Sequence, residues 1–258
     1  MYDTLHYILG AFSGGLVGLT LGLVGGGGSI LAVPLMVYVV GVANPHVAIG
    51  TSALAVAVNA ATSLSHHARG HTVRWRCGAI YAGAGIAGAV IGSTIGKAVD
   101  GQKLLFLFAL VMLVVGGVML KNRKAEGIPN AQCSRKNAAK VVGFGFGTGS
   151  FAGFFGIGGG FLIVPGLMAS TKMPMINAVG TSLVAVTAFG LTTSLNYALS
   201  GLVAWGIALV FIGGGIAGGL LGTGLARRLS GKGALTTVFA ALIFVVAAYM
   251  LWKSWAAL

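Results

Sequence analysis

The chain alternates between long runs without a charged residue and short connections that hold most of its charges. Residues 5–68, 77–96, 104–120, 141–171, 173–226 and 233–252 form the uncharged runs. Because a helix needs about 20 apolar residues to cross a bilayer core, the longest runs must cross more than once. Strands of a membrane barrel alternate polar and apolar residues, and these runs do not. The pattern therefore predicts helical membrane spans.

An internal repeat divides the chain, with an offset of 130 or 131 residues throughout. Three matches in the same order support it: the glycine clusters 25–28 and 156–160, each followed by a proline; the stretches 48–52 and 178–182; and the stretches 85–88 and 215–218. Similarity between glycine-rich stretches could give one such match by chance, but not three in order. The chain is thus predicted to contain two copies of one unit.

Each copy is predicted to hold a glycine-broken helix pair followed by three full helices. The pairs are 6–24 with 29–42 and 141–156 with 160–171, and the full helices are 47–66, 76–98, 103–120, 176–198, 203–227 and 233–252. The first segment is expected to be a membrane helix rather than a signal peptide, because no basic flank precedes it. We predict an all-α transmembrane bundle with repeats at 1–120 and 141–258, joined by a basic linker at 121–140.

Composition excludes a soluble globular protein. Hydrophobic residues make up 57% and charged residues 7% of the 258 positions, whereas a soluble domain has about 25% charged residues. The net charge is +13, and the only acids are Asp3, Asp100 and Glu126. Because the cations lie in short connections, membrane topology and anionic lipid explain them better than nucleic acid does. The glycine-rich stretches 83–88 and 213–219 are interpreted as seams of close helix packing.

The distribution of basic residues predicts the orientation. Basic loops usually face the cytoplasm, which places 67–75, the linker and 227–232 inside the cell. The weakly charged loops 99–102 and 199–204 and both termini then lie outside. Each half crosses an odd number of times, so the two halves are inverted, as in many secondary transporters. We expect a multi-pass protein of the inner (plasma) membrane.

The two glycine clusters are predicted to break their helices. Glycine costs about 1 kcal/mol per residue in a helix interior. A break inside a membrane is tolerated only where protein or a water-filled cavity covers the exposed backbone. We therefore expect two re-entrant hairpins whose tips face each other near the membrane midplane. Full spans in place of hairpins remain an alternative.

A site at these tips would favour an anion. Backbone amides at helix starts attract negative charge, with Ser29 as a candidate N-cap, and no Asp or Glu lies in any span. The candidate substrate-binding residues are Gly25, Gly26, Gly27, Gly28, Ser29, Thr51, Ser52, Asn59, Gly158, Gly159, Gly160, Thr181, Ser182 and Asn196. The structural alternative is packing for the glycines, carbonyl bonds one turn back for the hydroxyls and helix or interface contacts for the two asparagines.

Histidines and cysteines add little further chemistry. His66 and His67 end a predicted helix, either as an interfacial pair with Arg69 or as a proton relay. A zinc site would need a third convergent ligand, and none is evident, so neither a metal nor a cofactor is expected. Cys77 and Cys133 lie in or beside basic connections without metal-site spacing, and we do not expect them to pair.

The motifs resemble those of the sulfite exporter TauE/SafE family of membrane transporters. The resemblance rests on four glycines at 25–28 followed by Pro34, on Pro45-x-x-Ala-x-Gly-Thr-Ser52, and on the second copy at 177–182; it extends from about residue 8 to 252. It implies export of sulfur oxyanions or organosulfonates such as sulfite or sulfoacetate. Ile157 and Gly160 stand where the first copy has Gly26 and Ser29, so the half-sites differ, which suits one asymmetric substrate.

Four functional hypotheses follow. A carrier of small anions using alternating access is favoured over an anion channel or passive facilitator. An intramembrane serine protease built on Ser150 is disfavoured, because all five histidines lie in the first half, so no enzyme is expected. A non-transporting scaffold is the fourth. The expected partners are a small anion and membrane lipid. A homodimer is compatible with the sequence, although no surface argues for it.

Overall fold

The computed structural model describes residues 3–121, 128, 133, 135–158, 160–229 and 234–255. Over these residues the chain is helical and contains no strand. The elements are α1 Thr4–Val24, the 3₁₀ segment η1 Gly25–Leu31, α2 Ala32–Pro34, the π segment η2 Leu35–Val39, α3 Pro45–Arg69, α4 Trp75–Ala98, α5 Gly101–Lys121, α6 Arg135–Phe155, α7 Gly160–Thr171, α8 Met175–Ala198, α9 Trp205–Leu229 and α10 Ala234–Trp255.

The helical membrane fold predicted from the sequence is confirmed. All six predicted full helices are present within a few residues of their predicted ends, and both broken pairs are broken. The main difference is α6, which begins at Arg135 rather than at 141, because the basic residues of the linker's end already belong to its first turns. Among the described residues, six helices are long and apolar enough to cross a membrane: α1, α3, α4, α5, α8 and α9.

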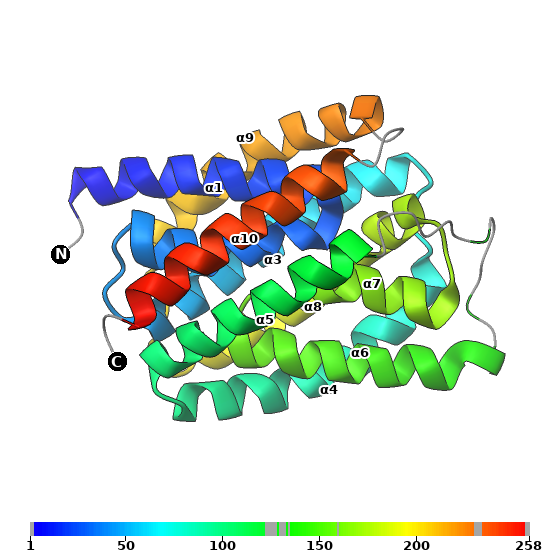
Figure 1. The fold of residues 1–258 in the computed structure, drawn as a ribbon, viewed down its shortest axis with the longest axis horizontal. Helices are drawn as coiled ribbons and strands as arrows, with labels where there is room; N and C mark the ends of the chain where they lie inside the picture. Colours follow the sequence, from blue (N-terminus) through cyan, green and yellow to red (C-terminus); the bar gives the residue numbers. More distant parts are fainter. Residues whose placement is uncertain are drawn as a thin grey trace.

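The packing of the outer helices follows the sequence repeat, because each packed pair in one part of the bundle has a corresponding pair in the other. In Figure 1, α1 lies along α9 at the top, α6 lies along α4 at the bottom, and α5 and α10 run side by side diagonally over the front of the bundle. The central helices α3 and α8 pack on each other. Since α6 and α4 are the repeat counterparts of α1 and α9, both outer pairs join a helix of one half to a helix of the other.

Glycines at one-turn spacing allow the outer pairs to approach closely. A Cβ added at Gly22 would lie 2.6 Å from the carbonyl oxygen of Gly219, and one added at Gly145 would lie 2.6 Å from that of Tyr81. The predicted packing seams are thus confirmed for glycines such as Gly85 and Gly215. They are wrong for Gly83 and Gly213, which face open space, because the close contact follows only one stripe of each helix.

The two ends of the bundle carry different connections. In Figure 1, α1 begins and α10 ends at the left, where α4 also meets α5 and α8 meets α9. The connection from α3 to α4 lies at the right. The cytoplasmic assignment, the inverted orientation in a membrane and the division into two repeats and a linker stay predictions.

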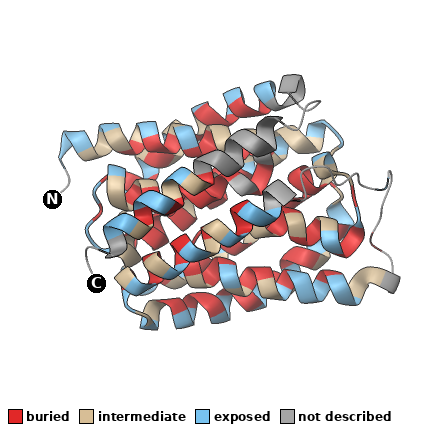
Figure 2. Ribbon diagram, in the orientation of Figure 1, coloured by how far each residue is buried: buried red, intermediate tan, exposed pale blue. Residues whose placement is uncertain are grey.

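Burial concentrates at the helix contacts. Figure 2 shows buried residues through the middle of the bundle and exposed residues along the outer side of α4 and α6. Many of the exposed residues are large and apolar, such as Phe12 (64% exposed), Val114 (67%) and Leu195 (62%). A belt of exposed apolar side chains is the surface expected of helices that face lipid.

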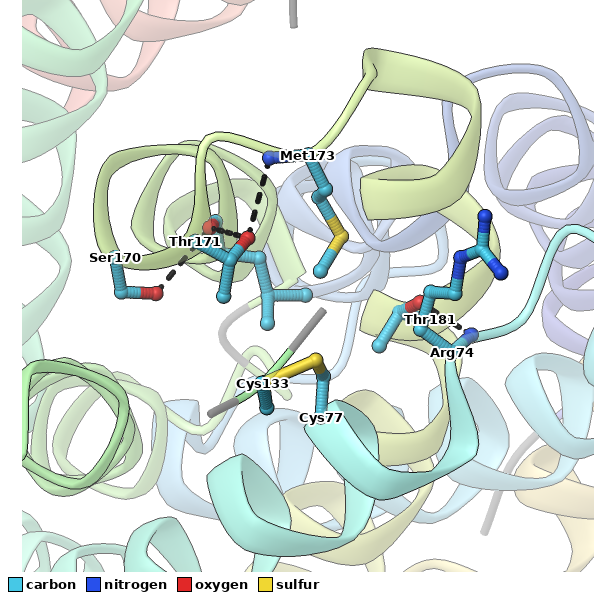
Figure 3. The surroundings of a disulfide bond; sticks show 8 residues. Arg74, Cys77, Cys133, Ser170, Thr171, Met173 and Thr181 are labelled. Carbon is cyan, nitrogen blue, oxygen red and sulfur yellow. Dashed lines mark hydrogen bonds between the residues drawn. A yellow bond between two sulfur atoms is a disulfide. The ribbon is translucent and has the colours of Figure 1, made fainter. Parts of the chain in front are cut away.

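The expectation that the two cysteines do not pair is wrong. Cys77 and Cys133 form a disulfide, with their Cα atoms 5.3 Å apart across a sequence separation of 56 residues. Cys77 belongs to the first turn of α4, and Cys133 lies two residues before α6 (Figure 3). Because α4 and α6 pack along each other, their neighbouring ends bring the two thiols together. Sequence spacing alone does not reveal that pairing.

Candidate transport site

Each glycine break is set by a residue in the left-handed region. Gly25 ends α1 with φ +67°, and Gly156 ends α6 with the same φ. A residue with a side chain would be strained there by about 1 kcal/mol or more, so glycine at these two positions is a backbone requirement. Both described breaks are buried, including Gly26, Gly28, Gly158 and Gly160.

The two breaks overlap instead of meeting tip to tip. Gly25 lies against Val179 on α8, and Gly156 lies against Ile49 on α3. Ile49 precedes Val56, near the middle of α3, by seven residues, or about 10 Å of helix. Each first limb therefore passes the centre of the bundle before it breaks. The breaks begin past the centre because α1 and α6 are both 21 residues long, and the expectation that the tips face each other near the membrane midplane stays a prediction.

The returning backbones touch where they cross. A Cβ added at Gly26 would lie 2.7 Å from the Cα of Gly160. Gly158 sits between two equivalent valines, and its added Cβ would lie 3.0 Å from Val56 and 3.4 Å from Val186. The sequence therefore predicted correctly that the clusters are neighbours, and the structure packs them backbone to backbone.

One predicted site residue holds the first break directly. The backbone N–H of Gly26 donates to Ser182 Oγ at 3.2 Å, and Ser182 Oγ donates to the Val179 carbonyl at 2.7 Å. The matching Ser52 hydroxyl donates to the Ile49 carbonyl at 3.0 Å. A hydroxyl thus occupies the position beside the Gly26 amide where an anion was expected.

Ser29 does not cap a helix as predicted. Its hydroxyl donates to the Gly26 carbonyl at 2.9 Å, and the side chain is fully buried. The N-cap expectation is wrong because Ser29 lies inside η1, where the 3₁₀ turn supplies a carbonyl for its hydroxyl. Of the other predicted glycines, Gly27 lies in η1, whereas Gly159 lies outside the described residues.

The two threonines of the repeated Gly-Thr-Ser stretch serve matching backbone contacts. Thr51 Oγ1 accepts from the N–H of Ala204 at 2.9 Å, and Thr181 Oγ1 accepts from the N–H of Arg74 at 2.9 Å (Figure 3). Those amides lie immediately before α9 and α4. Each hydroxyl therefore holds the start of a helix in the opposite half. This contact differs from the alternative in which a hydroxyl bonds a carbonyl one turn earlier in its own helix.

Asn59 is buried without a hydrogen-bond partner among the described residues. It is 1% exposed, and both its Oδ1 and its Nδ2 are unpaired. It packs against Gly215 of α9, whereas the second half places Phe189 against Gly85 at the matching position. Ser63, one turn further along α3, is also buried and unpaired. An unpaired polar pair inside a membrane helix bundle is costly, which marks this contact as a functional candidate.

Asn196 belongs to a different place. Its Oδ1 accepts from Lys97 Nζ at 2.7 Å, and Ser200 Oγ accepts from the same ammonium at 2.8 Å. Asn196 follows Ser182 by fourteen residues, or about 21 Å of α8. The structure therefore does not bring Asn196 to the breaks, and the interface interpretation fits its contacts.

His66 and His67 also lie away from the breaks, at the end of α3. His67 Nδ1 contacts Thr72 Oγ1 at 3.0 Å, and the His66 carbonyl accepts from the Gly70 N–H at 3.1 Å. They follow Ser52 by about 20 Å of helix. Their surroundings fit a helix-ending turn, and the proton relay stays a prediction.

Sequence reasoning missed several buried hydroxyls. Ser13, Ser63, Thr193 and the Tyr197 hydroxyl lack partners among the described residues. A signal existed for two of them, because Ser63 and Thr193 are related by the repeat offset of 130. A small hydroxyl residue at matched positions of two central helices could have been added to the candidates on that ground.

These features define a polytopic helical membrane protein with two buried helix breaks at its centre. The chain belongs to the family described as Sulfite exporter TauE/SafE, which it matches over residues 10–250. No solved structure matches it.

Three relatives from different organisms are each described as a probable membrane transporter protein. A probable membrane transporter protein of Xylella fastidiosa (strain Temecula1) is 56% identical over 249 residues, covering 95% of each chain. The probable membrane transporter protein YunE of Bacillus subtilis is 29% identical over 240 residues, covering 84% of this chain and 88% of its own. The probable membrane transporter protein MJ0441 of Methanocaldococcus jannaschii is 28% identical over 177 residues, covering 66% and 64%.

Proposed function

We propose that this chain carries small anions across the inner membrane by alternating access at the crossing of its two breaks. The observation that supports the proposal most is the backbone contact of Gly26 with Gly160 between α3 and α8. Two halves that meet through broken helices at one point give a site that can open to each side of the membrane in turn. Sulfur oxyanions and organosulfonates are the proposed substrates, and among these sulfite is the one that the family's description names.

The chemistry at the crossing favours an anion over a cation. The sequence places no Asp or Glu in any span, so a cation would depend on carbonyl oxygens alone. A carrier can instead offer the Gly26 amide and the Ser182 hydroxyl, which already contact each other at 3.2 Å. An anion that displaces this bond would be held by both donors, as anions are at other exposed backbone amides.

Burial of both breaks corresponds to a closed state of the proposed cycle. The backbone at Gly26 and Gly160 leaves no room for a Cβ, and so none for a substrate. Opening therefore requires η1 and α7 to part at this contact, on one side of the crossing at a time. The outer pairs α1 with α9 and α4 with α6 would move as units, because their glycine contacts are close along several turns.

A proteoliposome experiment tests the proposal. Purified protein is assayed for uptake of sulfite, thiosulfate, sulfoacetate, taurine and sulfate, with and without a pH gradient. We expect saturable uptake and counterflow of at least one anion. Gly26→Ala and Gly160→Ala should abolish that flux while the protein still inserts, because each adds a Cβ at the crossing.

Gly83→Ala is the matched control, since Gly83 lies in a helix and faces open space. Retention of normal flux in both crossing variants would refute the proposed site. Current that does not saturate and shows no counterflow would identify an anion channel instead. No flux of any tested anion in the wild type would favour the scaffold hypothesis.

A further inference from the structure

An apolar groove runs between α5 and α6 on the outside of the bundle. It has a volume of about 730 Å³, which is within the range of about 300–1,000 Å³ common for ligand sites. Its walls come from α5 and α6, and Leu162 of α7 closes one side. The lining residues include Val114 and Val115 of α5 and Lys140, Gly143, Gly147 and Thr148 of α6.

Two glycines of α6 create the groove. Gly143 and Gly147 are one turn apart, and a Cβ added at either would meet no atom within 4 Å. Packing does not require these glycines, because the tight contacts of α6 with α4 are made by the neighbouring stripe that includes Gly145 and Gly149. The missing side chains therefore leave open space on the surface rather than allowing two helices to approach.

The repeat shows that this space is particular to the second half. The offset of 131 that aligns Gly25 with Gly156 also aligns Phe12 with Gly143 and Leu16 with Gly147. In the first half large side chains thus cover the matching stripe of α1, and Phe12 is 64% exposed. Two halves built on one plan differ here by the removal of two large apolar side chains.

Among the described residues that line the groove, Lys140 at one end is the charged one. Lys140 is exposed and lies one turn before Gly143 on α6, toward the end of the bundle where α6 begins. The matching residue of α1 is Leu9. Two of the three acids of the chain, Asp3 and Asp100, lie at the opposite end of the bundle. A lysine can lay its aliphatic stem along an apolar wall and keep its ammonium at the membrane surface.

We propose that this groove binds one anionic phospholipid, with an acyl chain along Gly143 and Gly147 and the phosphate at Lys140. The polar groups of the floor support a chain rather than a polar ligand: Thr148 Oγ1 already bonds the Phe144 carbonyl at 2.7 Å and the Tyr81 hydroxyl at 2.9 Å. Basic residues beside grooves between membrane helices are typical partners of lipid headgroups.

A second copy of the chain fits the groove less well. Membrane dimers form around an axis perpendicular to the bilayer, and such an axis at this face would bring the two Lys140 ammonium groups toward each other. The lipid assignment is independent of the transport proposal, because it rests on the groove and its charge alone.

Native mass spectrometry of protein released from nanodiscs tests the proposal. The nanodiscs hold equal amounts of phosphatidylglycerol and phosphatidylcholine with identical chains. We expect one retained phosphatidylglycerol on the wild type. Gly147→Leu fills the groove and should remove the retained lipid. Lys140→Gln should lower the preference for phosphatidylglycerol about fivefold, since one lysine near an anionic surface contributes about 1 kcal/mol.

Gly83→Leu is the control, because Gly83 also faces open space on an exposed helix surface. It should retain lipid as the wild type does, and equal elution profiles of all variants establish that each is folded. Unchanged lipid retention in Gly147→Leu, or unchanged headgroup preference in Lys140→Gln, would overturn the proposal. So would loss of a dimer in Gly147→Leu, because the groove would then be an interface between copies.

Discussion

At the residue scale, the hydroxyls of the repeated Gly-Thr-Ser stretch have two different structural roles. Thr51 and Thr181 accept backbone N–H groups at the starts of α9 and α4, whereas Ser182 accepts from the first break. Adjacent residues thus differ in role although the sequence presents them as one motif. The contacts of the threonines fit a role in positioning helices. Of the two residue types, serine contacts a glycine cluster, through Ser182.

Replacing Thr181 with valine should destabilise the protein without an effect on substrate affinity. The part-buried Arg74 N–H would lose its acceptor, which should cost about 1 kcal/mol, at the lower end of the range of about 1–3 kcal/mol for a buried polar group without a partner. Thermal unfolding in detergent measures the loss, and Thr51→Val should give a similar value because its contact is equivalent. A raised KM for anion uptake with unchanged stability would instead make Thr181 a binding residue.

Replacing Asn59 with leucine should lower flux without lowering stability, the reverse of the effect expected for the Thr181 variant. The Asn59 amide is buried and unpaired among the described residues, so an apolar replacement of similar size should leave the unfolding temperature unchanged or higher. Phe189 at the matching position shows that the fold accepts an apolar side chain against this glycine seam. If the amide serves the substrate in an open state, flux should fall. Lower stability with normal flux per folded molecule would contradict this expectation.

At the element scale, a side chain added at a break would meet both backbone strain and tight packing. Two glycines allow the free-energy costs of these two effects to be measured separately. Gly156 has φ +67° and lies against Ile49, whereas Gly201 has φ +70° and meets no atom within 4 Å of an added Cβ. Gly201→Ala should therefore cost about 1 kcal/mol from backbone strain alone.

Gly156→Ala should lower stability by clearly more than Gly201→Ala, because its Cβ must also displace Ile49 in a closely packed interior. Chemical unfolding of both variants in the same detergent gives the difference. Equal losses would mean that the break is loosely packed, contrary to the contact of Gly156 with α3.

The elements were largely predictable from sequence, and their contacts were not. The offset between Gly25 and Gly156 located both breaks, and the uncharged runs located the full helices. The overlap of the breaks depends on the lengths of α1 and α6 past the bundle centre, which the sequence does not set by itself. The Cys77–Cys133 bond likewise depends on which helices pack, and pairing between helices leaves no trace in spacing.

The same limit applies to the candidate site. Gly26, Gly160 and Ser182 meet as neighbours because their three elements, η1, α7 and α8, all reach the crossing. Asn196 shares the helix of Ser182 but lies about 21 Å away, fourteen residues along α8. By residue type, Ser182 and Asn196 were equally good candidates for the site. Their different positions along α8 decide which of them reaches the crossing.

At the scale of the whole molecule, the disulfide and the predicted orientation imply different compartments for the end of the bundle that holds Cys77. The loop that precedes Cys77 holds Arg69 and Arg74, so the basic-loop rule places this end of the bundle in the cytoplasm. Disulfides, however, are rare in that reducing compartment. The two observations agree if the thiols stay reduced in the cell and pair only on oxidation, for which a Cα separation of 5.3 Å is suitable.

Maleimide labelling of intact cells decides between the compartments. With the basic end inside, Cys77 and Cys133 should be free thiols that react with a membrane-permeant maleimide only after denaturation, since both are nearly fully buried. In a variant with both cysteines replaced by serine, Gly201→Cys should react with an impermeant maleimide added outside, because Gly201 lies in an exposed turn at the opposite end. A disulfide already formed in cells, together with a Gly201→Cys thiol that reacts only after permeabilisation, would reverse the orientation and place the basic loops outside.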